Sequence, residues 1–448
     1  MCLGRPVWGP MAKAQDMSES YHECLTYLYG LEKHGIKLGL DTIRRLLAQC
    51  HHPERQFQVL HIGGTNGKGS AAAMTASILR AANIRVGLYT SPHLVDFRER
   101  IQVQGEQISE SRVVDLTERF RDNPDLKSCP TFFETVTAMA FKYFAEEKVE
   151  VAVLEVGMGG RFDATNVCDP LGVLVTNVSL DHEAYLGHTL EAIAYEKAGI
   201  IKPGIPVVMG PMESAAQTVI GQRATEEGAF VCHYGHDFSI EVQGDGVFDY
   251  QGVTTYFNLP CILKGSHQFD NAACALALIE NSVMPSRAIS EEAIIQGLGS
   301  VSWEGRLETL MTHPLMVCDG AHNPEAAIRL AHHLEAMIGD VPGRKLILIV
   351  AMMQDKNIDA CLSALLPLAS IVICTQIDHA RSATVQMLQH KINQEGLCVH
   401  GAATPSEAVA LATRLADPQD LICVTGSLFL VGAVKSMLAG STYVPIVG

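Results

Sequence analysis

A glycine-rich stretch carries the strongest chemical signal in this sequence. Residues 63–70 read Gly-Gly-Thr-Asn-Gly-Lys-Gly-Ser; they follow the apolar run 59–62 and precede the small residues Ala71–Ala73. Glycine lets a backbone wrap closely around a phosphate, while backbone N–H groups, a helix N-terminus and the Lys68 ammonium supply positive charge. The stretch is not a strict P-loop, because it has one residue fewer between its glycines and Gly69 stands where Ser or Thr belongs. It predicts phosphate binding; a tight turn without a ligand is the alternative.

Polar residues follow three other apolar runs. Ser91, Glu155 and His182 each stand within a few residues of the end of such a run. Because the carboxyl ends of parallel strands share one edge of a sheet, we expect these groups to converge there with the phosphate loop. Oxygen-rich groups beside nucleotide phosphates suit Mg²⁺, which keeps several waters and takes few protein ligands. The alternative is structural for each residue separately. Ser91 and His182 would cap a turn and a helix, and Glu155 would pair with Arg161.

Short apolar runs alternate with helix-length segments through the first part of the chain. The runs are continuous, as is typical of strands buried on both faces of a parallel sheet; they cover residues 59–62, 86–89, 151–154 and 173–175. Helical patterns cover residues 20–31, 41–48 and 135–145. This rhythm predicts an α/β fold with a mostly parallel, doubly wound sheet.

The pattern changes between residues 207 and 263. Short strands separated by turn residues predict a small antiparallel addition; they cover residues 207–209, 238–242 and 254–257. A helix is expected over residues 270–281. After a boundary at Trp303–Arg306, a second series of buried strands is expected over 315–318, 346–350, 371–374 and 421–424.

These elements predict three parts of the chain. Residues 1–20 read as a flexible extension. Residues 21–302 would form a P-loop nucleotide-binding domain with a mostly parallel sheet and the antiparallel addition. Residues 303–448 would form a Rossmann-like C-terminal domain.

Composition excludes several classes of protein. The chain has 448 residues and a formal net charge of −16, which argues against a general nucleic-acid binder because such proteins need a basic stripe. It has no run of about 18 apolar residues, so no membrane span is expected, and residues 1–20 lack a continuous apolar signal core. The 13 cysteines include no C-x-x-C pair, so reduced thiols in the cytoplasm are the simplest interpretation.

Six linked motifs resemble a known family. Gly64–Ser70 resembles the phosphate loop of the Mur-ligase superfamily. The other five resemble its folylpolyglutamate synthase branch: Ser91–Leu94 with Arg98–Ile101, Glu155–Asn166, Asp181-His182 with Leu186-Gly187, Glu196–Ile200, and Asp319–Pro324. The match runs in order from about residue 30 to 325. It is closest to the bacterial bifunctional dihydrofolate synthase/folylpolyglutamate synthases, and the C-terminal part matches in architecture more than in motif.

The resemblance implies a nucleotide site and a metal site. The residues that would bind ATP are Asn66, Gly67, Lys68, Gly69, Ser70, Asn271, Arg306, Asp319 and His322. Because the last three lie at or beyond the domain boundary, ATP should lie in the cleft between the domains. Mg²⁺ would be held by Ser91, Glu155 and His182, and a second ion by Lys197.

Lys197 corresponds to a lysine that is carboxylated by CO₂ in the family. A carbamate turns a cation into an anion, so it can hold a metal ion that an ammonium would repel. Without the resemblance, Lys197 reads as a solvated helix lysine. The groups implied to carry catalysis are Lys68, Glu155, His182 and Lys197.

A pterin substrate would lie on the N-terminal domain. The residues that the resemblance assigns to it are Ile36, Lys37, Leu38, Thr131, Phe132, Phe133, Glu134, Phe162, Asp163 and Ala164. Phe132 and Phe133 could stack on a flat heterocycle, or they could equally belong to the core.

The implied reaction joins a carboxylate to an amine. Transfer of the γ-phosphate of ATP to the carboxylate of dihydropteroate or a reduced folate gives an acyl phosphate, and the amine of L-glutamate then displaces phosphate. Mg²⁺, Lys68 and Arg306 would neutralise the moving charge. The expected protein is a monomer that binds neither nucleic acid nor membrane.

Three other activities fit part of the sequence. A cell-wall Mur ligase uses the same chemistry on a UDP-sugar peptide, but the 58 residues before the first strand are too few for its usual UDP-binding domain. A nucleotide-dependent regulatory protein would bind ATP without ligation. A small-molecule kinase would release a stable phosphorylated product.

Overall fold

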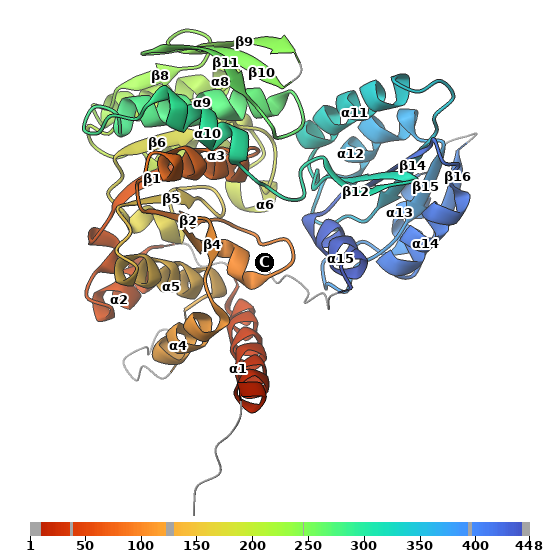
Figure 1. Ribbon diagram of the computed structural model, residues 1–448, viewed down its shortest axis with the longest axis horizontal. Coiled ribbons are helices and arrows are strands. Elements are labelled where there is room, and N and C mark those ends of the chain that lie inside the picture. The colour runs from red at the N-terminus through yellow and green to blue at the C-terminus, as the bar shows by residue number, and fades with distance from the viewer. Residues whose placement is uncertain (1–9, 36–38, 122–129, 245, 393–396, 441–448) are drawn as a thin grey trace, which may run out of the picture.

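The computed structural model describes residues 10–35, 39–121, 130–244, 246–392 and 397–440. These residues form two α/β units that lie side by side (Figure 1). The larger unit holds an eight-stranded and a three-stranded sheet, and the smaller unit holds a six-stranded sheet. The predicted fold class, a mostly parallel sheet with an antiparallel addition followed by a Rossmann-like unit, is confirmed.

The predicted apolar runs form the centre of the eight-stranded sheet. They are β1 (Gln58–Gly63), β2 (Val86–Tyr89), β5 (Val151–Glu155) and β6 (Gly172–Val175), all paired in parallel. The strand order is β4-β3-β2-β5-β1-β6-β7-β8. The edge strands β3 (Ile101–Val103) and β4 (Glu106–Gln107) are antiparallel. Since β1 lies between β5 and β6, the loops that follow these three strands open at the same edge of the sheet.

Helices cover both faces of this sheet. One face packs on α3 (Lys68–Ala81), α9 (His267–Ser282) and α10 (Glu291–Ser300). The opposite face packs on α1 (Pro10–Gly30), α2 (Asp41–Gln49), α4 (Glu110–Arg121) and α5 (Phe132–Glu146). A third cluster beside β6 includes α6 (Glu183–Leu186), α7 (Leu190–Lys197) and α8 (Ser214–Glu226). The small buried side chains of Ala71–Ala73 let α3, which begins at the phosphate loop, pack closely on the sheet.

The prediction that residues 207–209 belong to the antiparallel addition is wrong. They form β7 (Val207–Met209), which pairs in parallel with β6 and with β8 (Val231–His233) in the main sheet. All three residues of β7 are buried, as a central strand requires, but so short a run does not distinguish the two kinds of sheet. The antiparallel sheet consists of β9 (Ser239–Gly244), β10 (Val247–Gln251) and β11 (Thr255–Pro260). The middle strand, β10, was not predicted.

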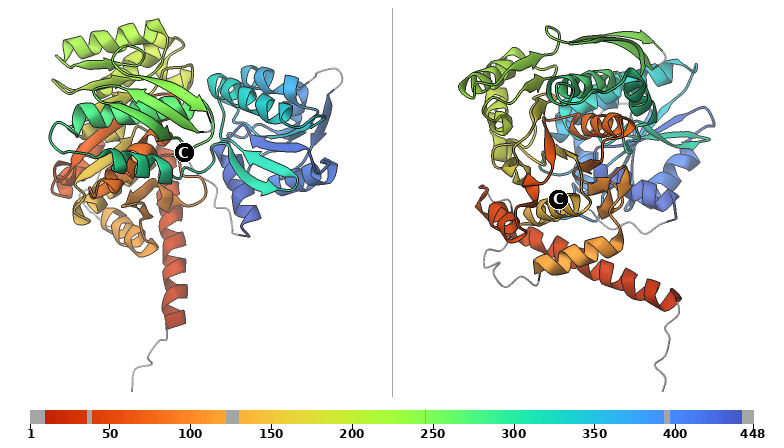
Figure 2. Two further views of the ribbon diagram at one scale, coloured as in Figure 1. Left: turned by 45° about the horizontal axis from the view of Figure 1, so that its top comes forward. Right: turned by 60° about the vertical axis from the view of Figure 1, so that its left-hand side comes forward.

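The first helix begins earlier than predicted. Residues 10–20 were expected to belong to a flexible extension, but α1 starts at Pro10 and continues to Gly30. It projects away from the rest of the larger unit (Figure 2). Residues 1–9 lie outside the described part of the chain.

The smaller unit has its own parallel sheet in the order β12-β13-β17-β14-β15-β16. The four predicted runs are β13 (Leu315–Cys318), β14 (Leu346–Val350), β15 (Ile371–Cys374) and β17 (Leu421–Thr425). β12 (Glu308–Thr312), which is antiparallel, and β16 (Cys398–Gly401) were not predicted. The helices are α11 (Pro324–Gly339), α12 (Ile358–Leu365), α13 (Val385–Lys391), α14 (Pro405–Leu415) and α15 (Leu428–Leu438). The chain passes between the two units in the segment that joins α10 to β12.

Two expectations from composition concern the cysteines and membrane-spanning helices. The cysteines in the described residues are all free thiols. Among the helices described, none is long and apolar enough to span a membrane.

Candidate active site

The phosphate loop joins β1 to α3, as predicted. Its turn depends on Gly67, which caps α3 with a φ of +82°, in the left-handed region that favours glycine. A Cβ at this position would also collide with Oδ1 of Asn271. The Lys68 ammonium donates to the Thr65 carbonyl (Nζ–O 3.0 Å). The sequence therefore folds into a closely wrapped loop with an amine at its centre, as phosphate binding requires.

The loop lines a cavity of about 180 Å³ whose walls come from both units. Predicted site residues of the larger unit that line it are Asn66, Gly67, Lys68, Gly69, Ser70, Ser91, Glu155, His182, Lys197 and Asn271. Those of the smaller unit are Arg306, Asp319 and His322. Every residue assigned above to ATP or metal binding therefore lies on one cavity. Their roles remain predictions, but the expected convergence at one sheet edge is present.

Glu155 ends β5 with its carboxylate buried. Its Oε2 accepts a hydrogen bond from the Ser91 backbone N–H (3.0 Å). Burial raises the pKa of Glu155, although the positive charge of Lys68 opposes this shift. Arg161 does not pair with it; Arg161 lies 3.8 Å from Glu196 (Nε–Oε1). The structural alternative for Glu155 is thus wrong, and the carboxylate is free to face a ligand.

His182 stands at the start of α6 with a φ of +52° and makes no side-chain cap to that helix. Burial and, to a smaller extent, the nearby Lys356 ammonium lower the pKa of His182 to about 4. The imidazole is therefore neutral at pH 7, which is the form that binds a metal ion. The capping alternative for His182 is wrong.

Lys197 is buried at the end of α7, with 3% of its surface exposed. Its Nζ donates to the Gly64 carbonyl at the phosphate loop (2.8 Å). Burial lowers the pKa of Lys197 to about 7, and the charge of Lys68 acts in the same direction. The alternative that Lys197 is a solvated lysine on a helix surface is therefore wrong.

The predicted metal ligands do not form a preassembled cluster. Within the described ranges, no group of three or more His, Cys, Asp or Glu side chains is arranged to hold a metal ion. Only Glu155 and His182 of the four predicted ligands belong to those residue types. Mg²⁺ requires few protein ligands because it keeps several waters, so such a sparse set suits it.

The smaller unit contributes a charged wall to the cavity. The Asp319 carboxylate accepts from the backbone N–H groups of Leu307 (3.0 Å) and Ala321 (2.8 Å), which fixes the turn that carries Arg306. Burial raises the pKa of Asp319, while Arg306 lowers it. His322 donates from Nδ1 to the Gly320 carbonyl (2.7 Å). Because both carboxylate oxygens of Asp319 accept backbone hydrogen bonds, Asp319 holds the loop in place.

Polar contacts across the cleft join the two units at this site. Asn323 donates to Oδ1 of Asn66 (2.9 Å) and to Oδ2 of Asp181 (3.2 Å). The Lys356 ammonium forms an ion pair with Oδ1 of Asp181 (2.5 Å). Lys356 was not singled out as a site residue, since no local pattern identifies a partner 175 residues away.

Two family descriptions match most of the chain. The Mur ligase middle domain matches residues 62–279, and the Mur ligase glutamate ligase domain matches residues 305–428. The dihydrofolate synthase/folylpolyglutamate synthase of Bacillus subtilis is 32% identical over 94% of this chain and 100% of its own length. The chain belongs to the dihydrofolate synthase/folylpolyglutamate synthase family of Mur ligases.

Other members of the family agree with this assignment. The probable bifunctional folylpolyglutamate synthase/dihydropteroate synthase of Haloferax volcanii is 36% identical over 93% of this chain, which spans about half (50%) of that longer relative. The Escherichia coli protein FolC, solved with DHPP and ADP, superposes with a TM-score of 0.86 at 31% identity, covering 94% of this chain and 98% of FolC. A bifunctional folylpolyglutamate synthase/dihydrofolate synthase solved with Mn, AMPPNP and L-glutamate bound gives a TM-score of 0.83 at 31% identity, covering 93% of this chain and 98% of that protein.

The described members of the predicted pterin set do not line the nucleotide cavity themselves, but Phe133 packs against Gly157, which does. Thr131 and Glu134 form the capping box of α5. Asp163 caps the short helix Ala164–Val167. Phe132 is a core residue, whereas Phe133 is half-buried and Phe162 is 43% exposed. Ala164 is buried, and residues 36–38 lie outside the described part of the chain. None of these positions is shown to bind a pterin, so their roles remain predictions.

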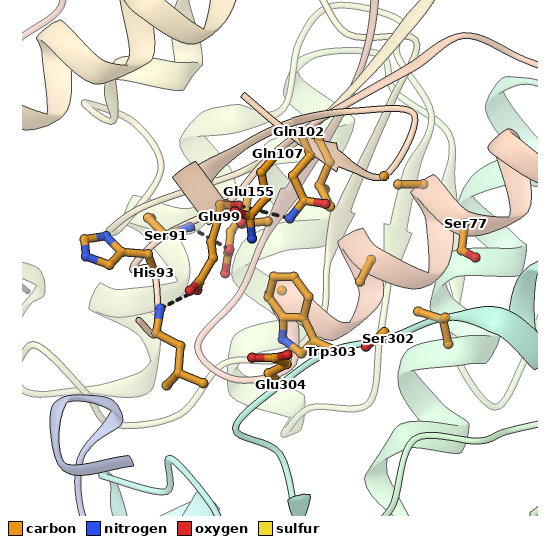
Figure 3. A pocket seen from close by; sticks show the side chains of 18 of the residues that line it. Ser77, Ser91, His93, Glu99, Gln102, Gln107, Glu155, Ser302, Trp303 and Glu304 are labelled. Atoms are coloured by element: carbon orange, nitrogen blue, oxygen red, sulfur yellow. Dashed lines mark hydrogen bonds between the residues drawn. The ribbon is translucent and has the colours of Figure 1, made fainter. Parts of the chain in front are cut away.

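A second cavity, of about 300 Å³, adjoins the first at Ser91 and Glu155 (Figure 3). Gln102 and Gln107 line it from β3 and β4, and Trp303 lines it from the segment that joins the two units. The Trp303 indole packs on the phosphate loop, so that a Cβ at Gly69 would approach its ring to 2.6 Å. Sequence analysis identified Trp303 only as a boundary residue.

Proposed function

We propose that this protein is an ATP-dependent ligase that adds L-glutamate to dihydropteroate, to reduced folates, or to both. The observation that carries the proposal is the convergence of Lys68, Glu155, His182 and Lys197 on one cavity between the two units. The names of its relatives support the same activity. So do the ligands named with the similar structures: ADP and DHPP in one, and AMPPNP, Mn and L-glutamate in another.

The chain's own residues suit activation of a carboxylate by phosphoryl transfer. The phosphate loop would hold the triphosphate, and Lys68 and Arg306 would neutralise charge that develops as the γ-phosphoryl moves to the acceptor carboxylate. The resulting acyl phosphate reacts with the free amine of glutamate; the C–N bond forms and phosphate leaves. Walls from both units would shield this activated acyl group from water.

The residues at the sheet edge fit a divalent cation. Glu155 offers a buried carboxylate with one hydrogen bond from a backbone N–H, and His182 offers a neutral imidazole. Together with the Ser91 hydroxyl they would hold Mg²⁺, which supplies charge neutralisation to the phosphates when bound. A metal would also favour the charged form of Glu155, which burial disfavours.

Lys197 is proposed to carry a carbamate. Its amine attacks the carbon of CO₂, forming an N–C bond, and one proton is released. The reaction needs an unprotonated amine, and the pKa of about 7 leaves a substantial fraction of Lys197 unprotonated at neutral pH. The product is an anion beside Lys68 and can provide carboxylate oxygens for a second metal ion.

The carbamate has a direct test. Intact-protein mass spectrometry after trapping of labelled bicarbonate should add one label per chain, and Lys197→Met should remove it. ATP turnover of the wild type should fall after exhaustive CO₂ removal and recover on addition of bicarbonate. An unlabelled wild type with full activity would exclude the modification.

The acceptor's pterin is proposed to lie beside α5. Phe133 and the exposed Phe162 offer faces on which a flat heterocycle can stack; Thr131 caps the start of α5, and Asp163 caps the start of the short helix Ala164–Val167. Phe132, Glu134 and Ala164 would support this surface from below because they are buried. Phe162→Ala should therefore raise the KM for the acceptor and leave the KM for ATP unchanged.

One assay tests the proposed activity. Purified protein with ATP and Mg²⁺ should release ADP only when glutamate and an acceptor are both present, and labelled glutamate should enter the product. Dihydropteroate and tetrahydrofolate as alternative acceptors define the substrate range. ADP release with neither substrate contradicts the proposal, and a stable phosphorylated product would indicate a kinase instead.

We further propose that the enzyme acts as a cytoplasmic monomer without nucleic acid. The net charge of −16 opposes association with nucleic acid. Light scattering of the purified protein should give the mass of one chain, 48.5 kDa.

A further inference from the structure

One carboxylate of the smaller unit reaches across the cleft to the phosphate loop. Glu325 lies in the first turn of α11, directly after the N-cap residue Asn323 and Pro324. Its Oε2 accepts a hydrogen bond from Nδ2 of Asn66, a residue of the loop (2.9 Å). Glu325 does not itself line the nucleotide cavity. It therefore contacts, from outside the cavity, two residues that line it, Asn66 and Asn177.

Asn177 connects this carboxylate to the loop backbone. Its Oδ1 accepts from the backbone N–H groups of Asn66 (2.8 Å) and Thr65 (3.2 Å). Its Nδ2 donates to both carboxylate oxygens of Glu325, each at 3.1 Å. Only one orientation of the amide satisfies both sides, because a carboxylate only accepts and an N–H only donates. Glu325 thus fixes the Asn177 amide in the orientation that the loop needs.

The charge of Glu325 is held in place within its own helix. Arg329, one turn further along α11, donates from Nη2 to Oε1 of Glu325 (2.6 Å). Burial disfavours the charged form, but Arg329 and the hydrogen bonds from Ser179 and Asn66 hold the pKa of Glu325 below its usual value. The start of a helix also stabilises an anion. Glu325 is therefore an anion with fixed geometry at neutral pH.

Arg329 and the phosphate loop line the same cavity. The contact of Glu325 with Asn177 and Asn66 can form only when the two units are together, since the partners lie on different units. Ordering the phosphate loop is consequently linked to the approach of the smaller unit, which also brings Arg306 to the cavity.

We propose that Glu325 is a positioning residue that orders the phosphate loop through Asn177 and Asn66 when the two units close. The proposal rests on the assignment of this loop as the nucleotide site under the proposed function. It requires nucleotide binding but not the identity of the acceptor, so the two can fail separately.

The test compares Glu325→Gln with the wild type. Glutamine keeps the size of the side chain but places an N–H₂ where an oxygen accepts from Asn177 or Asn66, so it offers one acceptor oxygen instead of two. We expect the Kd for MgADP from calorimetry, and the KM for ATP, to rise about 10-fold, which corresponds to the loss of one charge-assisted hydrogen bond. Glu335→Gln is the matched control, because Glu335 is exposed on the same helix; its Kd should equal that of the wild type.

A double-mutant cycle identifies the route. In an Asn177→Ala background, Glu325→Gln should raise the Kd less than about 3-fold, because the main contact is already missing. An equal effect in both backgrounds, or an unchanged Kd in the single variant, overturns the proposal.

Thermal unfolding of each variant distinguishes a positioning role from misfolding. A variant that weakens nucleotide binding with an unchanged melting temperature supports the positioning role. If the protein binds ADP normally but makes no folate product, the proposed function is contradicted and the proposal for Glu325 is not.

Discussion

At the scale of single residues, Glu155 shows how the site retains a buried carboxylate that costs folding free energy. A buried carboxylate with one backbone N–H partner is unfavourable in the absence of a cation. Lys68 and Arg306 are the positive groups that oppose the rise in its pKa. Such an arrangement is typical of a residue that is retained for binding rather than for stability.

Replacement of Glu155 should separate stability from activity. Glu155→Gln removes the charge at nearly constant size, so the melting temperature should stay the same or rise. The rate of acceptor-dependent ADP formation should fall on the order of 100-fold, as is usual for loss of one group that stabilises developing charge. Steady-state kinetics and calorimetric unfolding measure the two effects.

The exposed Glu106 on β4 provides the control. Glu106→Gln should change neither the rate nor the melting temperature. Full ligase activity in Glu155→Gln would mean that this carboxylate does not take part in the reaction.

At the scale of elements, the phosphate loop depends on a conformation that side chains resist. Gly67→Ala places a Cβ at a φ of +82° and against Asn271. We expect a loss of about 1–3 kcal/mol in the free energy of unfolding, together with weaker nucleotide binding. Urea unfolding and ADP titration measure these changes.

Gly221 makes a matched control within α8. It has no neighbour that a Cβ would touch and an ordinary helical φ. Gly221→Ala should stabilise the protein by about 0.5–1 kcal/mol and leave nucleotide affinity unchanged. If Gly67→Ala behaved in the same way as Gly221→Ala, the loop would not need its left-handed residue.

The strands of the main sheet were predictable where the sequence is locally unambiguous. Runs such as 151–154 are apolar throughout and are buried on both faces, so they were recognised as parallel strands. The run 207–209 is equally buried but has only three residues, and its neighbours β6 and β8 are fixed by tertiary structure. The start of α1 was missed because residues 1–20 were interpreted as an extension and the helical pattern was taken to begin at residue 20.

The site was predictable in its motifs but not in its environment. The glycines and Lys68 specify the phosphate loop directly, and the strand ends place Ser91 and Glu155 beside it. The burial of Lys197 depends on the contact of its Nζ with the Gly64 carbonyl in the loop, and the sequence of α7 alone does not reveal this contact. The partners of Glu325 and Lys356 lie on the other unit, more than 100 residues away along the chain.

At the scale of the whole molecule, buried neutral histidines make stability depend on pH. Burial lowers the pKa of His61 to about 3, and it lowers that of His182, His267 and His322 to about 4. The unfolded chain binds protons at these groups near pH 6.5, whereas the folded chain does not. Stability is therefore fully present above that pH and falls as the pH drops toward 4.

His61 allows one of these histidines to be tested by itself. It lies in the core, where its Nε2 forms a hydrogen bond with Oγ1 of Thr165 (2.8 Å). Between pH 6 and 4 the free energy of unfolding of His61→Gln should fall less steeply than that of the wild type. The difference in slope is at most about 1.4 kcal/mol per pH unit for one proton. His332→Gln, at an exposed position of α11, is the control. Equal slopes for all three proteins would show that His61 titrates normally. Urea unfolding at several pH values measures them.

The connection between the two units has one more consequence. The chain contains two tryptophans, and Trp303 lies in this connection with its indole against Gly69 at the beginning of α3. Indole emission depends on the polarity and packing around the ring. Nucleotide binding beside Gly69, or a change in the separation of the two units, should therefore change the emission of Trp303, so this residue offers an intrinsic fluorescent probe of the site.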